Sequence, residues 1–146
     1  METMTESDGP LACNCVALRK AARRISAYYD ACLAPAELRA TQYAILALID
    51  MRGALSVNAI GHALGMDRST AGQNLRPLER DGLLVLTQSA QDGRARMVSL
   101  TSVGEARLHK ARPLWDHAQA AFEIANGAAS AASLRATLGG LAIPGA

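Results

Sequence analysis

The spacing of apolar residues predicts a mostly helical chain. Over residues 10–33, apolar side chains recur every three or four positions, which is the pattern of one helix face. Residues 41–51 are apolar at most positions, so we expect a buried helix there, capped by Thr41 and ended by Gly53. Both segments therefore predict helices that pack against the rest of the molecule.

The next stretch has the pattern of a helix-turn-helix. Ser56 is expected to cap a short helix that ends at Gly65, and Asp67 is expected to cap a second helix that runs to about residue 80. A short turn containing glycine is typical of this motif. Pro77 predicts a bend or a loosened last turn in the second helix.

The second of these helices has two chemically different sides. At about 100° per residue, the apolar side consists of Ala71, Leu75 and Leu78. The opposite side and its flanks carry Ser69, Thr70, Gln73, Asn74, Arg76 and Arg80. Side chains of these types bind base edges or phosphates. Gly72 is less stable here than Ala by about 1 kcal/mol, which indicates a close approach of another surface or a packing requirement.

Two apolar segments after this helix predict a β-hairpin. Residues 83–88 and 96–101 are the strands, and Asp92 with Gly93 is the turn signal between them. Residues 54–55 are compatible with a further, very short strand. Arginines at the hairpin tip suit the negative potential of a narrow minor groove, and an ordinary solvated turn explains them equally well.

Two more helices complete the chain. Residues 102–105 form a capping box for a long helix to about Asn126, in which Pro113 is expected to introduce a kink. Residues 128–139 predict a final Ala-rich helix. The fold class is therefore mainly α with a small β-wing. It forms one domain over 1–146: a winged helix-turn-helix with helices on both sides.

Composition narrows the class of protein. Half of the residues are hydrophobic, but no run reaches the roughly 18 apolar residues of a membrane span, and the polar N-terminus lacks the features of a signal peptide. We therefore expect a cytoplasmic protein that does not bind membranes. A net charge of +2 does not by itself indicate a nucleic-acid partner. A basic run on the first helix is interpreted as a solvated face in preference to a direct DNA contact: Arg19, Lys20, Arg23 and Arg24.

The sequence also argues against an enzyme. It contains no G-x-x-x-x-G-K, H-E-x-x-H or G-x-S-x-G motif, so we expect no catalytic residues and no cofactor. An odd number of cysteines, three, argues against a disulfide framework. The histidines are isolated and Cys13-Asn14-Cys15 has no second cluster beside it, so no metal site is expected.

Three segments in the correct order resemble the MarR family of transcriptional regulators. They are LRATQYAILALI (38–49), MDRSTAGQNLRPLERDGLL (66–84) and DGRARMVSLTSVGEA (92–106). The resemblance covers about residues 11–140 and implies a homodimer, most often a repressor, on a pseudo-palindromic operator in double-stranded DNA. The implied dimerisation lobe is about 10–36 and 102–140, and the implied DNA-binding lobe is about 41–101.

The resemblance also assigns roles to individual residues. Ser69, Thr70, Gln73 and Asn74 match positions that contact bases, and Arg68, Arg76 and Arg80 match phosphate contacts. In the wing, Asp92 is implied to orient the hairpin and Arg94 to enter the minor groove. Gly93 replaces a frequent basic residue, which makes Arg96 more important. Two alternatives stay open: Arg80 pairs with Glu79 or Asp81, and Asn74 is a packing residue.

Two kinds of control are common in this family. Cys13 and Cys15 lie where a helix dipole favours a thiolate, with Arg19 one turn after Cys15, and this position resembles that of the oxidant-sensing cysteine in one branch. The alternative is that both are small buried hydrophobic residues. A small aromatic effector is the other possibility, with a pocket lined by Tyr43, Trp115 and His117. The alternative function for the whole chain is a winged-helix module that binds protein without binding DNA.

Overall fold

The computed structural model describes residues 9–91 and 93–146 and is mostly helical with a small antiparallel sheet. This confirms the predicted fold class. The elements in chain order are η1 (Gly9–Ala12), α1 (Asn14–Leu33), η2 (Ala34–Ala36), α2 (Ala40–Arg52), β1 (Leu55–Ser56), α3 (Val57–Leu64), α4 (Arg68–Arg80), β2 (Leu84–Gln88), β3 (Arg96–Leu100), α5 (Ser102–Asn126) and α6 (Ala128–Gly139).

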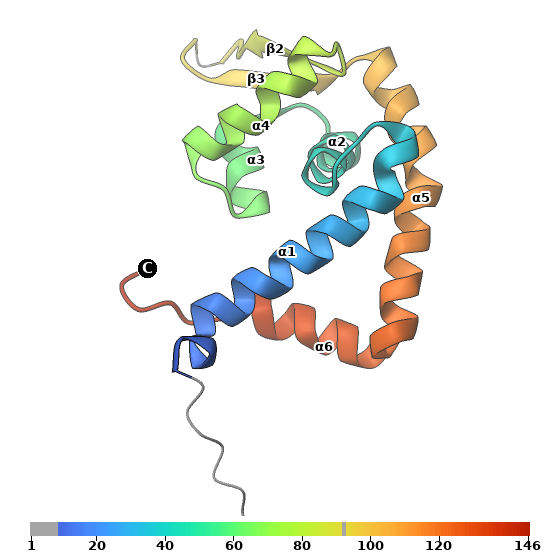
Figure 1. The fold of residues 1–146 in the computed structure, drawn as a ribbon. Coiled ribbons are helices and arrows are strands. Elements are labelled where there is room, and N and C mark those ends of the chain that lie inside the picture. Colours follow the sequence, from blue (N-terminus) through green and yellow to red (C-terminus); the bar gives the residue numbers. More distant parts are fainter. Residues whose placement is uncertain (1–8, 92) are drawn as a thin grey trace, which may run out of the picture.

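The helices and the sheet are arranged in two parts (Figure 1). Helices α2, α3 and α4 gather beside the sheet, while α1, α5 and α6 extend away from it. The α5 helix runs from the sheet along one edge of the molecule to α6, which crosses its far end. Nearly all buried apolar side chains lie in the first part and at its junction with α1 and α5, among them Leu33, Ile45, Leu78 and Leu108.

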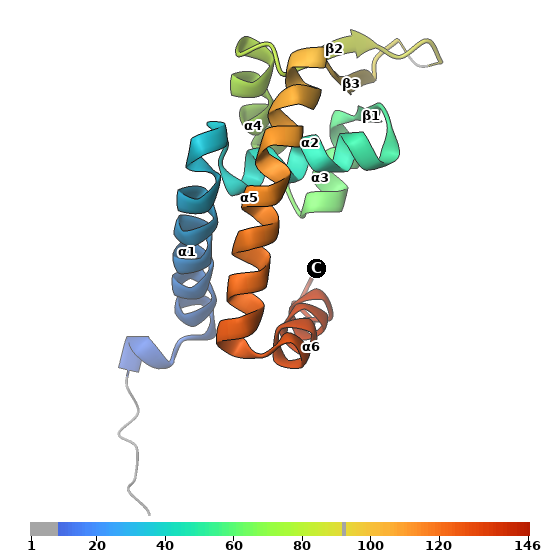
Figure 2. The same cartoon turned by 90° about the vertical axis from the view of Figure 1, so that its right-hand side faces the viewer.

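The sheet has three strands in the order β1-β3-β2, all antiparallel. Leu84 pairs with Leu100 and Gln88 pairs with Arg96, which sets the register of the hairpin. The β1 strand adds to the other edge of β3 through Leu55 and Ser56. The very short strand expected at residues 54–55 is thus present one residue later, and it attaches the wing to the start of α3 as well as to α4. The hairpin itself projects from this part of the molecule (Figure 2).

Two predicted caps are confirmed. The Ser56 hydroxyl accepts a hydrogen bond from the Ala59 N–H at 3.1 Å, and the Asp67 carboxylate accepts one from the Thr70 N–H at 2.7 Å. Gly65, in the left-handed conformation at φ 69°, ends α3 as predicted. Each bond satisfies an N–H group in a first helical turn that has no partner within its helix.

Other predicted helix starts are wrong by one or two residues. The α2 helix begins at Ala40, not after Thr41, because Asp30 of α1 accepts a hydrogen bond from the Ala40 N–H at 2.7 Å. The α5 cap is Thr101 rather than Ser102, since the Thr101 hydroxyl accepts from the Gly104 N–H at 3.0 Å and donates to the Gly82 carbonyl at 2.6 Å. In both cases, a contact with a distant segment of the chain helps to set where the helix begins.

The N-terminal helix is also interrupted where one continuous helix was expected. The 3-10 helix η1 ends at Ala12, and Cys13 has an extended backbone before α1 begins at Asn14. In contrast, Pro113 does not divide α5, which remains one helix of 25 residues. Likewise α4 continues through Pro77 to Arg80.

The helices α1 and α6 bury little of their apolar surface within one chain. Leu33 is the buried residue of α1, and Ala131 is that of α6. Large apolar side chains stay exposed along this part of the molecule: Leu11, Leu18, Tyr28, Ile124, Leu134, Leu138, Leu141 and Ile143. An extensive apolar surface of this kind is typical of a protein–protein interface. In the described residues, no helix has the length and hydropathy needed to cross a membrane.

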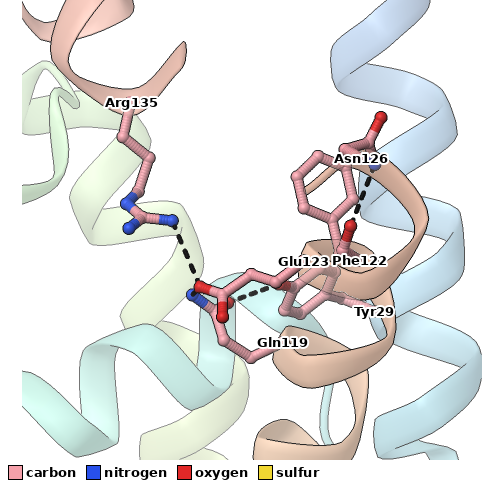
Figure 3. A network of polar contacts seen from close by, with 6 residues as sticks. All are labelled: Tyr29, Gln119, Phe122, Glu123, Asn126 and Arg135. Carbon is pink, nitrogen blue, oxygen red and sulfur yellow. Dashed lines mark hydrogen bonds and ion pairs between the residues drawn. The ribbon is translucent and has the colours of Figure 1, made fainter. Parts of the chain in front are cut away.

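A polar network connects α1, α5 and α6 (Figure 3). The Tyr29 hydroxyl of α1 donates to Gln119 Oε1 of α5 at 2.5 Å, and the Gln119 amide donates to Glu123 at 3.4 Å. Arg135 of α6 pairs with the same Glu123 carboxylate at 3.6 Å. The network therefore links α1, α5 and α6 through four side chains, Tyr29, Gln119, Glu123 and Arg135.

Gly104 allows the start of α5 to lie directly on the backbone that leads into β2. A Cβ atom at Gly104 would overlap the carbonyl oxygen of Leu83, whereas a Cβ at Gly72 meets no atom within 4 Å. We predict that Gly104→Ala lowers the free energy of unfolding by roughly 3 kcal/mol or more. Gly72→Ala is the matched control and should raise it by about 0.5–1 kcal/mol. Urea unfolding at one protein concentration measures both, and a change below about 0.5 kcal/mol in Gly104→Ala would contradict the close approach.

Candidate nucleic-acid interface

The α4 helix has one buried side and one exposed side, as its sequence predicts. Ala71, Leu75 and Leu78 are 0–2% exposed and pack into the core. The opposite side chains all reach solvent: Ser69, Gln73, Arg76 and Arg80. Packing of the apolar side thus fixes the direction in which the polar side points. We call these four exposed residues the α4 crest.

The turn between α3 and α4 is held by a close backbone contact. The Met66 N–H donates to the Gly61 carbonyl at 2.8 Å, and a Cβ at Gly61 would lie 2.8 Å from the Met66 carbonyl oxygen and 3.6 Å from the Ala71 Cβ. Gly61 is buried, so a side chain there would separate the two helices. The role of Gly61 is not apparent from the sequence, because it depends on the packing of α3 against α4.

Two predicted contact residues of α4 have partners within the chain. The Asn74 amide donates to the Thr70 carbonyl at 2.9 Å and lies 4.0 Å from the Met66 sulfur. The Arg80 guanidinium lies 3.4 Å from the Asp81 carboxylate, and both side chains are largely exposed. The alternative roles for these two residues, packing for Asn74 and pairing with Asp81 for Arg80, are thus both present in this structure. An exposed ion pair contributes little to stability, so Arg80 remains available to a stronger anion.

The wing brings its arginines to the side of α4. The Ser89 N–H donates to the Ala95 carbonyl at 2.8 Å and continues the hairpin beyond the paired strands. Arg94 and Arg96 are exposed near its tip, and Asp92 lies outside the described residues. The hairpin therefore supplies two cations to the same surface as α4.

A hollow of about 600 Å³ separates α4 from the wing. We call it the wing-side hollow. It brings together four predicted contact residues from two elements: Arg68, Arg76, Arg94 and Arg96. Glu79 also lines it, whereas the sequence suggested Glu79 only as a possible partner of Arg80. Among the described residues that line the hollow, four are arginines and one, Glu79, is a carboxylate, so this part of the lining carries an excess of positive charge.

Gly72 lines the wing-side hollow too, and no described atom lies within 4 Å of a Cβ built on it. A packing requirement inside the described chain therefore does not explain this glycine. The other explanation, a close approach of another surface to the α4 backbone, remains a prediction.

Cys13 and Cys15 lie at the start of α1, far from α4. Cys13 is the N-cap residue and Cys15 belongs to the first turn, and both are exposed free thiols. The interpretation of these two cysteines as small buried hydrophobic residues is therefore wrong for the single chain. Among the described residues, no group of three or more His, Cys, Asp and Glu side chains is placed to hold a metal ion.

The rings of Tyr43 and Trp115 lie together between α2 and α5. They stack with centroids 5.6 Å apart and an interplanar angle of 15°, and burial raises the pKa of the Tyr43 phenol. His117 is exposed. The two rings pack on the core at the junction of the two parts of the molecule, and an effector pocket formed with His117 remains a prediction.

The known proteins that this chain resembles are transcriptional regulators. A sequence profile of the MarR family matches residues 37–95. The Mycobacterium tuberculosis transcriptional regulator MosR, solved in complex with DNA, is 36% identical, with a TM-score of 0.73, over 79% of this chain and 84% of that one. The transcriptional repressor CouR, solved on a 23-mer DNA duplex, is 26% identical, with a TM-score of 0.78, over 94% and 97%. CouR was also solved with p-coumaroyl-CoA, at 25% identity.

A curated relative adds a further comparison. The organic hydroperoxide resistance transcriptional regulator of Bacillus subtilis is 29% identical over 97 residues. The match spans 66% of each chain, so about a third of that relative lies outside it.

The α4 cap generates a prediction about pH. The Thr70 N–H, followed by the Thr70 hydroxyl, holds the pKa of Asp67 below its usual value. A lowered carboxyl pKa stabilises the fold above the unfolded pKa of about 3.9, and this contribution is lost as pH falls through the folded pKa. We therefore expect wild type to lose stability relative to Asp67→Asn as the pH falls below about 4.

Asn caps a helix as well as Asp but does not titrate, which makes Asp67→Asn the matched control. Urea unfolding of both proteins across this pH range measures the difference. Parallel curves for the two proteins would contradict the role of the charge.

Proposed function

The chain belongs to the MarR family of DNA-binding transcriptional regulators, and we propose that it acts as a homodimeric repressor on a pseudo-palindromic operator. Each protomer inserts α4 into a major groove and the wing into the adjacent minor groove. The observation that carries this proposal is the cationic surface formed by the α4 crest and the wing-side hollow. It supplies base-reading amides and hydroxyls beside phosphate-binding arginines.

The residue roles follow from this docking. Ser69, Thr70 and Gln73 contact bases, and Asn74 joins them if it exchanges its bond to the Thr70 carbonyl for a base edge. Arg68, Arg76 and Arg80 contact phosphates. In the wing, Arg94 and Arg96 enter the minor groove, where the negative potential is strongest. Asp92 orients the hairpin.

Dimerisation uses the surface that one chain leaves exposed. We assign the dimerisation lobe to about 10–36 and 102–140 and the DNA-binding lobe to about 41–101. The exposed apolar side chains of α1 and α6 support this division, because the described residues of their own chain leave them uncovered. Two-fold symmetry then places the α4 helices on half-sites about one helical turn apart.

We propose that oxidation at Cys13 and Cys15 releases the operator. Exposure of both thiols supports access by an oxidant, and Arg19 is one helical turn after Cys15. The name of the Bacillus subtilis relative refers to organic hydroperoxides. The second candidate signal is a small aromatic effector that binds at Tyr43, Trp115 and His117. The structure of CouR with p-coumaroyl-CoA, a ligand with an aromatic group, supports this class of effector.

The DNA-binding proposal predicts a loss of affinity when the arginines are neutralised. We expect Arg76→Gln, Arg94→Gln and Arg96→Gln together to weaken promoter binding roughly tenfold or more. The salt slope should fall by about 0.9 for each phosphate that the variant no longer neutralises, and each substitution occurs twice in a dimer. Fluorescence anisotropy at several salt concentrations measures both quantities.

Lys110→Gln is the control, because it removes one exposed charge from α5, outside the residues to which we assign DNA contacts. If the triple variant keeps both the affinity and the salt slope of wild type, the chain is instead a protein-binding winged helix.

The sensing proposal predicts that thiols are required for release by peroxide. We expect the double variant Cys13→Ser and Cys15→Ser to bind the promoter normally and to remain bound after peroxide treatment. Cys32→Ser is the matched control and should still be released, since Cys32 lies near the opposite end of α1. Release of the double variant at the wild-type peroxide concentration would overturn the proposal. Release of the double variant by an aromatic acid alone would support the second signal.

A further inference from the structure

The α4 crest lies between two hollows. The second has a volume of about 490 Å³ and lies on the side of α4 away from the wing. On α4 it is lined by Gln73, Asn74, Pro77 and Arg80. Across from them lie Ser26 and Asp30 of α1 and the start of α2, from Arg39 to Gln42. We call it the inner hollow, and its walls include segments outside the helix-turn-helix.

Helix geometry places the two hollows on opposite flanks of the crest. At about 100° per residue, Gly72 and Glu79 lie roughly 40–60° to one side of Arg76, and Arg80 and Gln73 lie roughly 40–60° to the other. The first pair lines the wing-side hollow and the second pair lines the inner hollow. Arg76 therefore marks the ridge that separates them.

A helix in the major groove has one sugar–phosphate backbone on each side. The groove is only about 12 Å wide, so a helix that enters it brings both of its flanks towards phosphates. The wing-side hollow offers arginines to one strand. From this geometry, and on the basis of the proposed function, we propose that the inner hollow binds a backbone phosphate of the other strand through Arg39 and Arg80.

The charged groups around the inner hollow favour the arginines as its phosphate ligands. The N-terminus of α2 is already occupied, since Asp30 accepts from the Ala40 N–H at 2.7 Å and Gln42 accepts from the Arg39 N–H at 2.9 Å. Among the lining residues, two arginines face the one carboxylate of Asp30, and the Asp81 carboxylate lies 3.4 Å from Arg80 at the edge of the hollow. Guanidinium groups bind phosphate in a bidentate, charge-assisted way, so a phosphate competes effectively with Asp81 for Arg80.

The proposal extends the DNA-binding surface to the junction of α1 and α2. Arg39 precedes the segment assigned to the DNA-binding lobe, and no part of the helix-turn-helix signature points to it. A phosphate held between Arg39 and Arg80 would also link α4 to the end of α1. The angle between the two parts of the protein would then influence affinity directly.

The test is the salt dependence of operator binding by Arg39→Gln. Two copies per dimer should lower the salt slope by about 1.8 between roughly 50 and 200 mM salt. Affinity should fall by a similar factor for operator and unrelated DNA, because phosphate contacts carry no sequence information. Arg39→Lys keeps the charge and should keep most of the slope. Lys110→Gln serves as the charge control, and thermal unfolding checks that each variant is folded.

The outcomes separate this proposal from the function on which it rests. Wild type without affinity for its promoter would overturn the proposed function itself. If neutralising Arg76, Arg94 and Arg96 lowers the slope but Arg39→Gln leaves it unchanged, only the present proposal fails.

A free anion is the remaining possible occupant, and calorimetry with inorganic phosphate in the absence of DNA tests it. Saturable binding that Arg39→Gln abolishes, together with an unchanged DNA slope, would make the hollow a small-anion site and overturn the proposal.

Discussion

The burial of one side of α4 is the constraint on which the recognition surface depends. Ala71, Leu75 and Leu78 are nearly inaccessible, so α4 is not free to rotate about its axis. A rotation that exposed these side chains would cost roughly 1.5–3 kcal/mol for each leucine. The direction of the crest is therefore set by the core, and the wing and the end of α1 are positioned around a ridge that is already fixed.

Local signals predicted much of this arrangement. The apolar period of α4, the caps at Ser56 and Asp67 and the turn at Gly65 are all encoded within a few residues, and the structure has each of them. Helix periodicity even separates the crest from the buried side. The candidate site was thus predictable where it lies on a single helix or a single hairpin.

Contacts between distant segments explain what the sequence did not predict. Asp30 caps α2 from another helix, and Thr101 acts as a cap because its hydroxyl also reaches Gly82. Gly104 is required only because α5 meets the backbone at Leu83. The inner hollow is a similar case, since its walls come from three helices. These features depend on residues that are far apart in the sequence, so they cannot be predicted from any short segment and are seen only in the folded protein.

The α1 helix connects the two thiols that we propose as a sensor to the phosphate site that we propose at the inner hollow. This helix of 20 residues, about 30 Å long, begins at the exposed thiols and ends at the inner hollow. The segment from η2 to α2 contacts α5 through two partly solvent-exposed ion pairs, Arg107 with Glu37 and Arg112 with Asp50, the second at 2.5 Å. If oxidation of the thiols tilts α1 as a rigid helix, Ser26 and Asp30 move with it relative to α4. Because the opposing wall of the inner hollow belongs to the recognition helix, such a tilt would change the spacing of the cations that face the second DNA strand, without any change in the residues that read the bases.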